Sequence, residues 1–279
     1  MTYGYNVKLP QLADVTNGFV VTDYRQVLRG ASILVSANSH TFISNYQYGK
    51  IQDNFMAGVN TIVSLTNGGY RPDLAINTDF NYASKVQNPF PTNTFRLSGN
   101  AQYYSSAIYA RFKFKPTFSI SDYQNALNGI DIRKTRLINS SFELSMRSAY
   151  LSWFNFHTGG NVSFSKATTK IADEKNNIHN QSINTFLDFY FRFSSRFFAG
   201  LDNEYFTFNQ DQSVPQNYFF SNASANYNFL DGRMILSLRL KNILNSQAFI
   251  SNSVNDYLIS TQQIRLVPRF FLFEFEFKF

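Results

Sequence analysis

Four polar side chains on one face of a predicted strand form the chain's best set for hydrolytic chemistry. Asn155, His157, Asn161 and Ser163 stand at alternate positions in "FNFHTGGNVSFS", so a strand would direct them to one side. A serine hydrolase needs its histidine base within about 3 Å of the nucleophile. Neighbours on one face of a strand are already about 7 Å apart. We therefore favour a structural role for His157 within its strand. We expect no catalytic residue and no enzyme activity.

Metal and phosphate sites have little support in the sequence. Asp173 and Glu174 lie in the loop sequence "IADEKNN", but their spacing differs from that of an EF-hand calcium loop, and we favour a solvated loop tip. The chain has no cysteine, which excludes disulfides, thiol catalysis and cysteine-based zinc sites. The segment "TNGGY" at 66–70 is typical of a turn and not of a phosphate loop. We expect no metal and no cofactor.

Charged residues alternate with phenylalanine at the end of the chain, in "FLFEFEFKF" at 271–279. Glu274, Glu276 and Lys278 occupy every second position, so they would share one face of a strand. Inward charges of this kind can form the selectivity ring of a channel. We favour an ion-pair network with Arg239 and Lys241 of the preceding strand. Because the basic residues behind the net charge of +7 are spread singly over many segments, we expect no nucleic-acid partner.

The alternation of apolar and polar residues recurs along most of the chain. It has a period of two residues in "AIYARFKFKPTFSI" at 107–120, "SFELSMR" at 141–147, "INTFLDFYFRF" at 183–193 and "RMILSLRLK" at 233–241. The composition agrees, because 31 Phe and 17 Tyr accompany only 15% charged residues while the mean hydropathy is −0.25. No run approaches the roughly 18 apolar residues of a membrane helix. The sequence predicts an all-β protein.

Tight turns alternate with long polar stretches between the predicted strands. "YSSA" at 104–107, "SAYL" at 148–151, "FSSR" at 193–196 and "LDGR" at 230–233 predict turns, and "SDYQNALNGIDIRKT" and "TTKIADEKNNIHNQ" predict long surface loops. This layout is typical of an antiparallel up-and-down transmembrane β-barrel, whose strands need about 9 to 11 residues. We predict about 12 to 14 strands, with a long irregular connection over 1–38 and regular hairpins over 39–279.

The phenylalanine rows distinguish lipid from a soluble core. A soluble sandwich, such as a lectin or adhesin, needs interlocking aliphatic shapes, whereas lipid imposes no such packing. A closed barrel also pairs its backbone groups without water. We expect the Phe rows to face outer-membrane lipid and the charged rows to face a wet lumen. The predicted lumen-facing residues are Arg111, Lys113, Glu143, Arg147, Asp188, Arg192, Arg239, Glu274, Glu276 and Lys278.

The last two predicted strands carry a family resemblance. "LSLRLKNILNSQAFI" followed by "VPRFFLFEFEFKF" resembles the end of TonB-dependent receptors, where an Asn-Leu-Phe-Asn-like motif precedes a closing aromatic strand. Residues 242–245, Asn-Ile-Leu-Asn, stand at that motif. Upstream, "YGYNVKLPQLADVTNG" and "VLRGASILVSANSHTFISNYQYGK" are similar to an earlier section of such barrels, although Gly-Ala-Ser at 30–32 replaces the usual Gly-Asn-Pro-type turn.

The resemblance implies the wall of a transport channel for ligand uptake, inserted by the barrel assembly machinery and coupled to a TonB system through an N-terminal part that we do not expect in these 279 residues. Such receptors carry an N-terminal plug inside a larger barrel, and we find no plug domain here. We expect the chain to supply roughly the C-terminal half of a larger wall in the outer membrane of a Gram-negative bacterium. The alternative is a plugless barrel, acting as a small channel or as a scaffold that docks a surface lipoprotein or other protein partner.

Overall fold

The computed structural model describes residues 1–23, 26–50, 53–76, 81–127, 132–148, 153–171, 173–211, 214–229, 233–254 and 259–277. Most of these residues lie in strands, and α1 (Leu12–Val15) is a single helical turn. A helix with the length and hydropathy of a membrane span does not occur in these ranges. The prediction of an all-β protein is confirmed.

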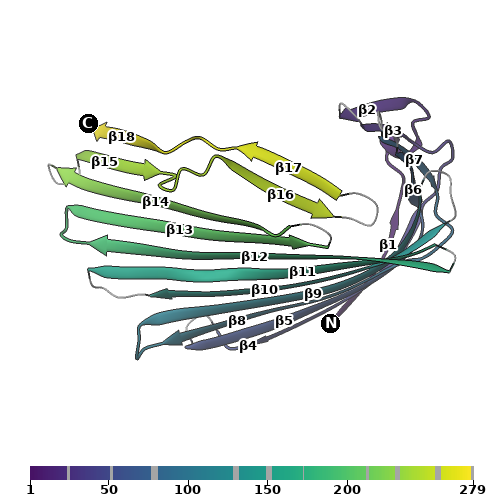
Figure 1. The fold of residues 1–279 in the computed structure, drawn as a ribbon. Helices are drawn as coiled ribbons and strands as arrows, with labels where there is room; N and C mark the ends of the chain where they lie inside the picture. Colours follow the sequence, from purple (N-terminus) through teal and green to yellow (C-terminus); the bar gives the residue numbers. More distant parts are fainter. Residues whose placement is uncertain are drawn as a thin grey trace.

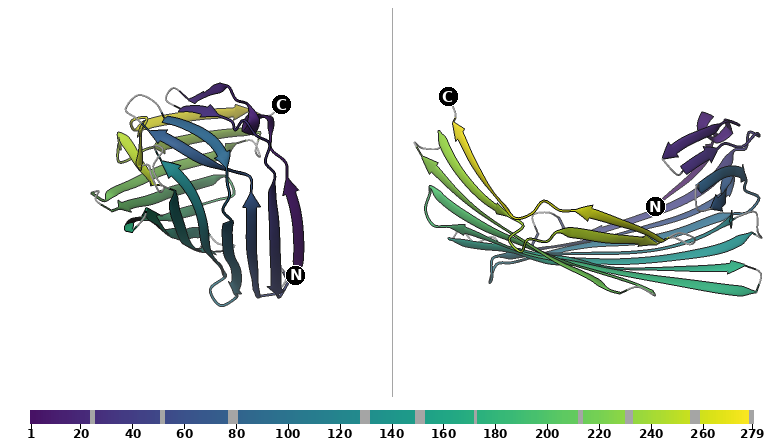
Figure 2. Two further views of the ribbon diagram at one scale, coloured as in Figure 1. Left: turned by 90° about the vertical axis from the view of Figure 1, so that its right-hand side faces the viewer. Right: turned by 45° about the horizontal axis from the view of Figure 1, so that its top comes forward.

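Twelve strands form one continuous antiparallel wall (Figure 1). Neighbours along the wall follow the order of the sequence, so the topology is up-and-down. Figure 2 shows the wall curved into a trough, of which β1 and β18 are the two edges among the described strands. In spatial order the wall strands are β1 (Thr2–Lys8), β4 (Ala37–Tyr48), β5 (Phe55–Gly68), β8 (Thr92–Ser105), β9 (Ala110–Leu127), β10 (Arg133–Ser148), β11 (Phe154–Ile171), β12 (Glu174–Arg192), β13 (Phe197–Gln210), β14 (Gln216–Phe229), β15 (Met234–Lys241) and β18 (Phe270–Phe277).

Two insertions depart from the wall. β2 (Phe19–Asp23), β3 (Gln26–Arg29), β6 (Tyr70–Ile76) and β7 (Asn81–Gln87) form an accessory sheet, in which β6 runs parallel to the last residues of β9. β16 (Ala248–Val254) and β17 (Ile259–Arg265) form a separate hairpin between β15 and β18. The accessory sheet lies at the end of the wall opposite the tight turns, which we name the outer end (Figure 1).

Strand register gives the wall one apolar and one polar face, because directly paired residues share a face. Phe142 of β10 pairs with Val162 of β11, and the next pair, Glu143 with Asn161, points to the opposite side. We name the side of Phe142 the outer face and the side of Glu143 the inner face. The β16–β17 hairpin lies on the inner face, within the trough (Figure 2).

The alternating segments form strands as predicted, and the tight turn at 193–196 separates β12 from β13. The prediction for residues 1–38 is wrong in part, because β1 belongs to the wall, where it pairs with β4 over its whole length. Tyr3 supports this pairing through its ring, 4.9 Å from that of Phe42, and through a 2.8 Å hydrogen bond between its hydroxyl and His40 Nδ1. These are tertiary contacts that a local pattern does not encode.

The predicted long loops are largely strand. β9 and β11 contain 18 residues each and β12 contains 19, so their hairpins extend through the polar stretches that we interpreted as loops. The last pair of the β11–β12 ladder is Ile171 with Glu174. Polar composition indicates exposure to water here and not irregular backbone, since a hairpin pairs its backbone groups whether or not its side chains are apolar.

Candidate functional site

One row of inner-face side chains crosses five neighbouring strands at the same height. Arg111 of β9 pairs with Arg147 of β10, and Arg147 pairs with His157 of β11. On the other side, His157 pairs with Asp188 of β12, and Asp188 pairs with Asp202 of β13. We name these five residues the charged row. Its cations stand at one end and its carboxylates at the other.

His157 is the junction between the two ends of the charged row. Its Nδ1 lies 3.8 Å from Asp188 Oδ2, and its ring meets that of Phe186 edge-on, with centroids 4.6 Å apart. The Asp188 side chain is 16% exposed and the His157 side chain 35%. Gly159 makes the position of Phe186 possible, because a Cβ on Gly159 would lie 2.9 Å from Phe186 Cζ.

The hydrolase candidates are not brought together. Ser163 stands six positions from His157 on the same strand, which is roughly 20 Å at 3.3 Å per residue. The hydroxyl of Ser163 lies 2.6 Å from that of Ser182 on β12, and Asn161 Oδ1 accepts a hydrogen bond from Ser141 Oγ at 3.1 Å. Asn155 Oδ1 accepts from Ser148 Oγ at 3.3 Å. These groups form cross-strand hydrogen bonds of the wall.

A hollow of about 410 Å³ adjoins the charged row on the inner face. Its lining includes Lys113, Lys115, Glu143 and His157. Lys115 Nζ lies 2.9 Å from Glu143 Oε1, and both side chains are about half exposed (52% and 41%). The hollow therefore presents an ion pair, a lysine and an imidazole to the space inside the trough.

The predicted lumen-facing residues share the inner face where the structure describes them. By register these are Arg111, Lys113, Glu143, Arg147, Asp188, Arg192, Arg239, Glu274 and Glu276. Lys278 lies outside the described residues. The predicted ion pairing of the C-terminal ladder is present, since Arg239 Nη2 lies 3.0 Å from Glu274 Oε2. The Arg192 guanidinium instead lies over the ring of Phe198, 5.8 Å from its centroid.

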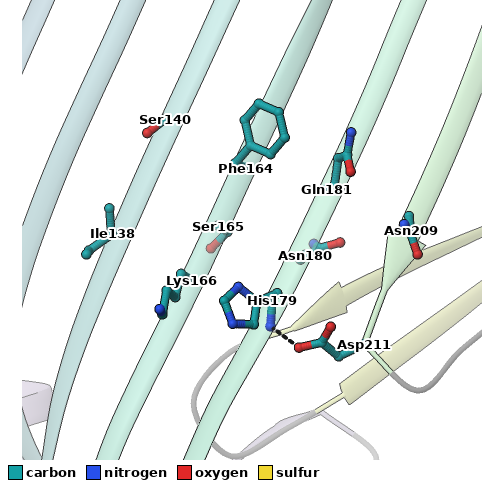
Figure 3. Close-up of a pocket in the computed structure, with 10 residues that line it drawn as sticks. All are labelled: Ile138, Ser140, Phe164, Ser165, Lys166, His179, Asn180, Gln181, Asn209 and Asp211. Atoms are coloured by element: carbon teal, nitrogen blue, oxygen red, sulfur yellow. Dashed lines mark hydrogen bonds between the residues drawn. The ribbon is translucent and has the colours of Figure 1, made fainter.

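Near the outer end, the outer face changes from apolar to polar (Figure 3). Phe164 of β11 pairs with Gln181 of β12, and the next outer-face pair is Lys166 with His179. Asp211 stabilises this part of β12, because its Oδ2 accepts a hydrogen bond from the backbone N–H of His179 at 2.8 Å. On β9 and β10 the same change occurs at an ion pair in which Arg136 donates to both carboxylate oxygens of Asp122, at 2.7 and 3.0 Å.

An aromatic cluster on the inner face was not predicted from the sequence. Phe249 of β16 inserts among four rings of β13 and β14, with centroid distances from 4.9 to 6.0 Å. The hydroxyl of Tyr218 also accepts the N–H of Ile250 at 3.0 Å. A signal was present in the sequence, since these rings occupy the polar phase of their strands. The four rings are Phe206, Phe208, Tyr218 and Phe220.

The motif at 242–245 forms the junction between the wall and this hairpin. Asn242 and Asn245 have φ of 52° and 57°, a conformation that asparagine tolerates better than most residues. Asn242 Nδ2 donates to the carbonyl oxygens of Ser246 and Val267 at 2.8 and 2.9 Å, and Asn245 Oδ1 accepts the N–H of Arg269 at 2.9 Å. The two amides therefore join the start of the insertion to its end.

Metal ligands are not gathered in the described ranges, where no three His, Asp or Glu side chains are placed to hold an ion. Glu174 begins β12, directly after a turn that includes Asp173. No protein-family model matches the chain, and a comparison with curated proteins found no significant match. The resemblance to TonB-dependent receptors stays a prediction based on the motifs.

Proposed function

We propose that the chain forms part of the wall of an outer-membrane channel for ligand uptake, of the TonB-dependent receptor type, with the inner face lining the ligand path. The observation that carries this proposal is a mostly apolar band on the outer face, whose polar members, such as Asn203 and Ser221, are uncharged and hydrogen-bond to each other. The band extends over all twelve wall strands, and none of its described positions is Asp, Glu, Lys or Arg. The charged residues that lie at the level of this band along the wall strands are on the inner face.

The height of the band fits the hydrocarbon layer of a membrane. A tilted strand needs about 9 to 11 residues to cross this layer. On β9 the outer face is apolar from Phe112 to Ile120, and Asp122 follows. On β12 it is apolar, with one threonine, from Ile183 to Phe191, and Gln181 and His179 stand beyond it. Each row covers nine residues and ends where the outer face becomes polar, which Figure 3 shows for β12.

Exposure of the band argues against a water-soluble chain. Phe271, Phe273 and Phe275 are 70%, 65% and 57% exposed, and Leu144 in the middle of the wall is 57% exposed. Soluble monomers rarely expose contiguous apolar patches above a few hundred Å². In a membrane, lipid chains would cover these exposed rings, and lipid does not require the interlocking side chains of a protein core.

Insertion into lipid bilayers tests the proposal directly. The full chain, refolded with phospholipid vesicles, should float with them on a density gradient and resist extraction at alkaline pH. Protease added outside should leave the membrane-embedded parts of the wall strands intact. A folded chain that remains in the aqueous fraction would contradict the proposal.

A scaffold that docks a protein partner is the second candidate, and the accessory sheet favours it. Phe19 and Val21 on β2 are 68% and 71% exposed. The strand β2 that carries them lies at the outer end, beyond the apolar band, where lipid would not cover it (Figure 1). A photo-crosslinking residue at Val21 should then capture an envelope protein on the cell surface, whereas the same residue at Leu144 should capture lipid.

A further inference from the structure

The charged row places like charges side by side where opposite charges would be more stable. Arg111 and Arg147 are direct cross-strand partners, and so are Asp188 and Asp202. Like charges in directly opposite positions destabilise a sheet. Exchange of one arginine with one aspartate would produce two opposite-charge pairs in the same row. The arrangement therefore maintains a separation of charge that the stability of the wall does not require.

The neighbouring row that begins at Lys113 has the same polarity. Lys113 of β9 is followed along its row by Ser145, Gly159 and Phe186, and the row reaches Glu204 on β13. The cross-strand neighbour of Arg111 on β8 is Tyr104, so no carboxylate stands opposite Arg111 at that position. The acid on the basic side, Glu143, is paired with Lys115. Arginine and lysine together dominate the charge of the inner face over β9 and β10, and Asp188, Asp202 and Glu204 outnumber Arg192 over β12 and β13.

We infer that this face binds short zwitterionic peptides, with the terminal carboxylate at Arg111 and Arg147 and the terminal ammonium at Asp188 and Asp202. Arginine binds carboxylates through two parallel hydrogen bonds, and carboxylates accept from ammonium groups. Strands lie about 4.8 Å apart, so the row offers opposite charges from about 10 Å apart, two strands away, to about 19 Å, four strands away. An extended peptide of about three to five residues spans this range.

Room for such a ligand is present beside the row. The hollow of about 410 Å³ adjoins His157 and opens to the inner face, where Asn161 and Asn184 offer amide groups to a peptide backbone. This inference rests on the proposed function, because it assigns the ligand class of the same channel face. A single anion or cation would engage only one end of the row, so both termini of the peptide are needed for full affinity.

The test compares three peptides that differ only at their ends. Tetraglycine, N-acetyl-tetraglycine and tetraglycine amide are titrated into the full chain in detergent micelles and followed by calorimetry. We expect tetraglycine to bind at least about tenfold more tightly than either blocked form. Asp202→Asn should weaken the binding of tetraglycine and reduce the difference in affinity between tetraglycine and the acetylated peptide. Arg147→Gln should reduce the difference in affinity between tetraglycine and tetraglycine amide. Arg192→Gln, on the inner face but outside the row, should change none of the three affinities.

The outcomes separate this inference from the proposed function. If the chain inserts into vesicles but binds the three peptides equally, or none of them, the peptide site is overturned and the membrane wall stands. If Arg192→Gln weakens binding as much as Arg147→Gln, the ligand recognises general charge and the assignment to the row is overturned. If the folded chain does not insert, the proposed function fails, and the peptide site fails with it.

Discussion

The ring of Phe249 lies 4.9 Å from that of Tyr218 and thereby holds the β16–β17 hairpin against the inner face. Three further rings complete the cluster, and the hairpin forms its own two-stranded sheet, with no ladder to the wall among the residues that the structure describes. Side-chain packing therefore fixes its position. The hairpin narrows the trough beside β13 and β14 (Figure 2).

Phe249→Ala should release the hairpin and leave the wall intact. Truncation of a fully buried phenylalanine costs about 3 to 5 kcal/mol. The loss should fall on the hairpin alone, because the backbone hydrogen bonds between the wall strands do not involve the ring of Phe249. We expect faster amide hydrogen exchange over 248–254 and 259–265, with unchanged exchange in β13. Ile264→Ala, at a half-exposed position opposite Phe249 in the hairpin, is the matched control and should have little effect. Equal exchange in Phe249→Ala and the original chain would contradict the role of this ring.

Arginine substitutions on β12 test which face meets lipid. Leu187 stands at the centre of the apolar row from Ile183 to Phe191 and is 40% exposed, so Leu187→Arg should lower the free energy of unfolding in vesicles by about 2 to 4 kcal/mol. Asn184→Arg, on the inner face of the same strand, should be mild. The measurement is reversible denaturant unfolding in the same vesicles. Similar losses for both variants would show that the two faces have been assigned incorrectly.

A proline in the middle of the wall gives a third prediction. β8 and β9 pair at Ser98–Thr117 and again at Ala101–Phe114, and Pro116 lies between, where it has no N–H to donate. Gly99 faces it, and a Cβ on Gly99 would lie 3.1 Å from Pro116 Cγ. Gly99→Val should therefore destabilise the wall by about 1 to 3 kcal/mol. The same change in a Pro116→Ala background should have a smaller effect, and additive effects in this double-mutant cycle would refute the contact.

Much of the wall could be predicted from sequence, because a period of two residues directly specifies a strand with two different faces. The segment from β9 to β15 follows this rule, as does β18, and the ion pair of Arg239 with Glu274 follows from the ladder at the chain end. The charged row could not be predicted, since it depends on the register of four strand pairs at once. A shift of one residue between β10 and β11, or between β11 and β12, would already separate Arg147 from Asp188.

The accessory sheet was missed for a related reason. Its parallel pairing of β3 with β7, and of β6 with β9, joins segments that are far apart in sequence and that no single hairpin turn connects. The inner aromatic cluster was missed because Phe206 and Phe208 contradict the polar phase of β13, and only the position of Phe249 explains them. In both places a contact between distant segments overrides the local pattern.

The ion pair of Asp14 with Lys85 gives the last prediction, on pH. It connects α1 to β7 in the accessory sheet, outside the apolar band, and Asp14 Oδ2 also accepts the N–H of Gln11 at 2.8 Å. The hydrogen bond from Lys85, and then that from Gln11, hold the pKa of Asp14 below its ordinary value of 3.8. Because the pKa is lower in the folded state, the ion pair contributes its full stability above about pH 4 and loses it as the pH falls through the folded pKa.

Hydrogen exchange over 12–15 and 81–87, corrected for the intrinsic pH dependence of amide exchange, measures this contribution. Protection in the original chain should fall as the pH drops below about 4, whereas Asp14→Asn should show reduced protection at neutral pH and little further loss on acidification. Asp73→Asn is a suitable control, because Asp73 lies in the same accessory sheet and its carboxylate has no ion pair among the described residues. If Asp14→Asn retained the full acid-dependent loss, the pH dependence would originate in another group and the ion pair would not anchor α1 to β7.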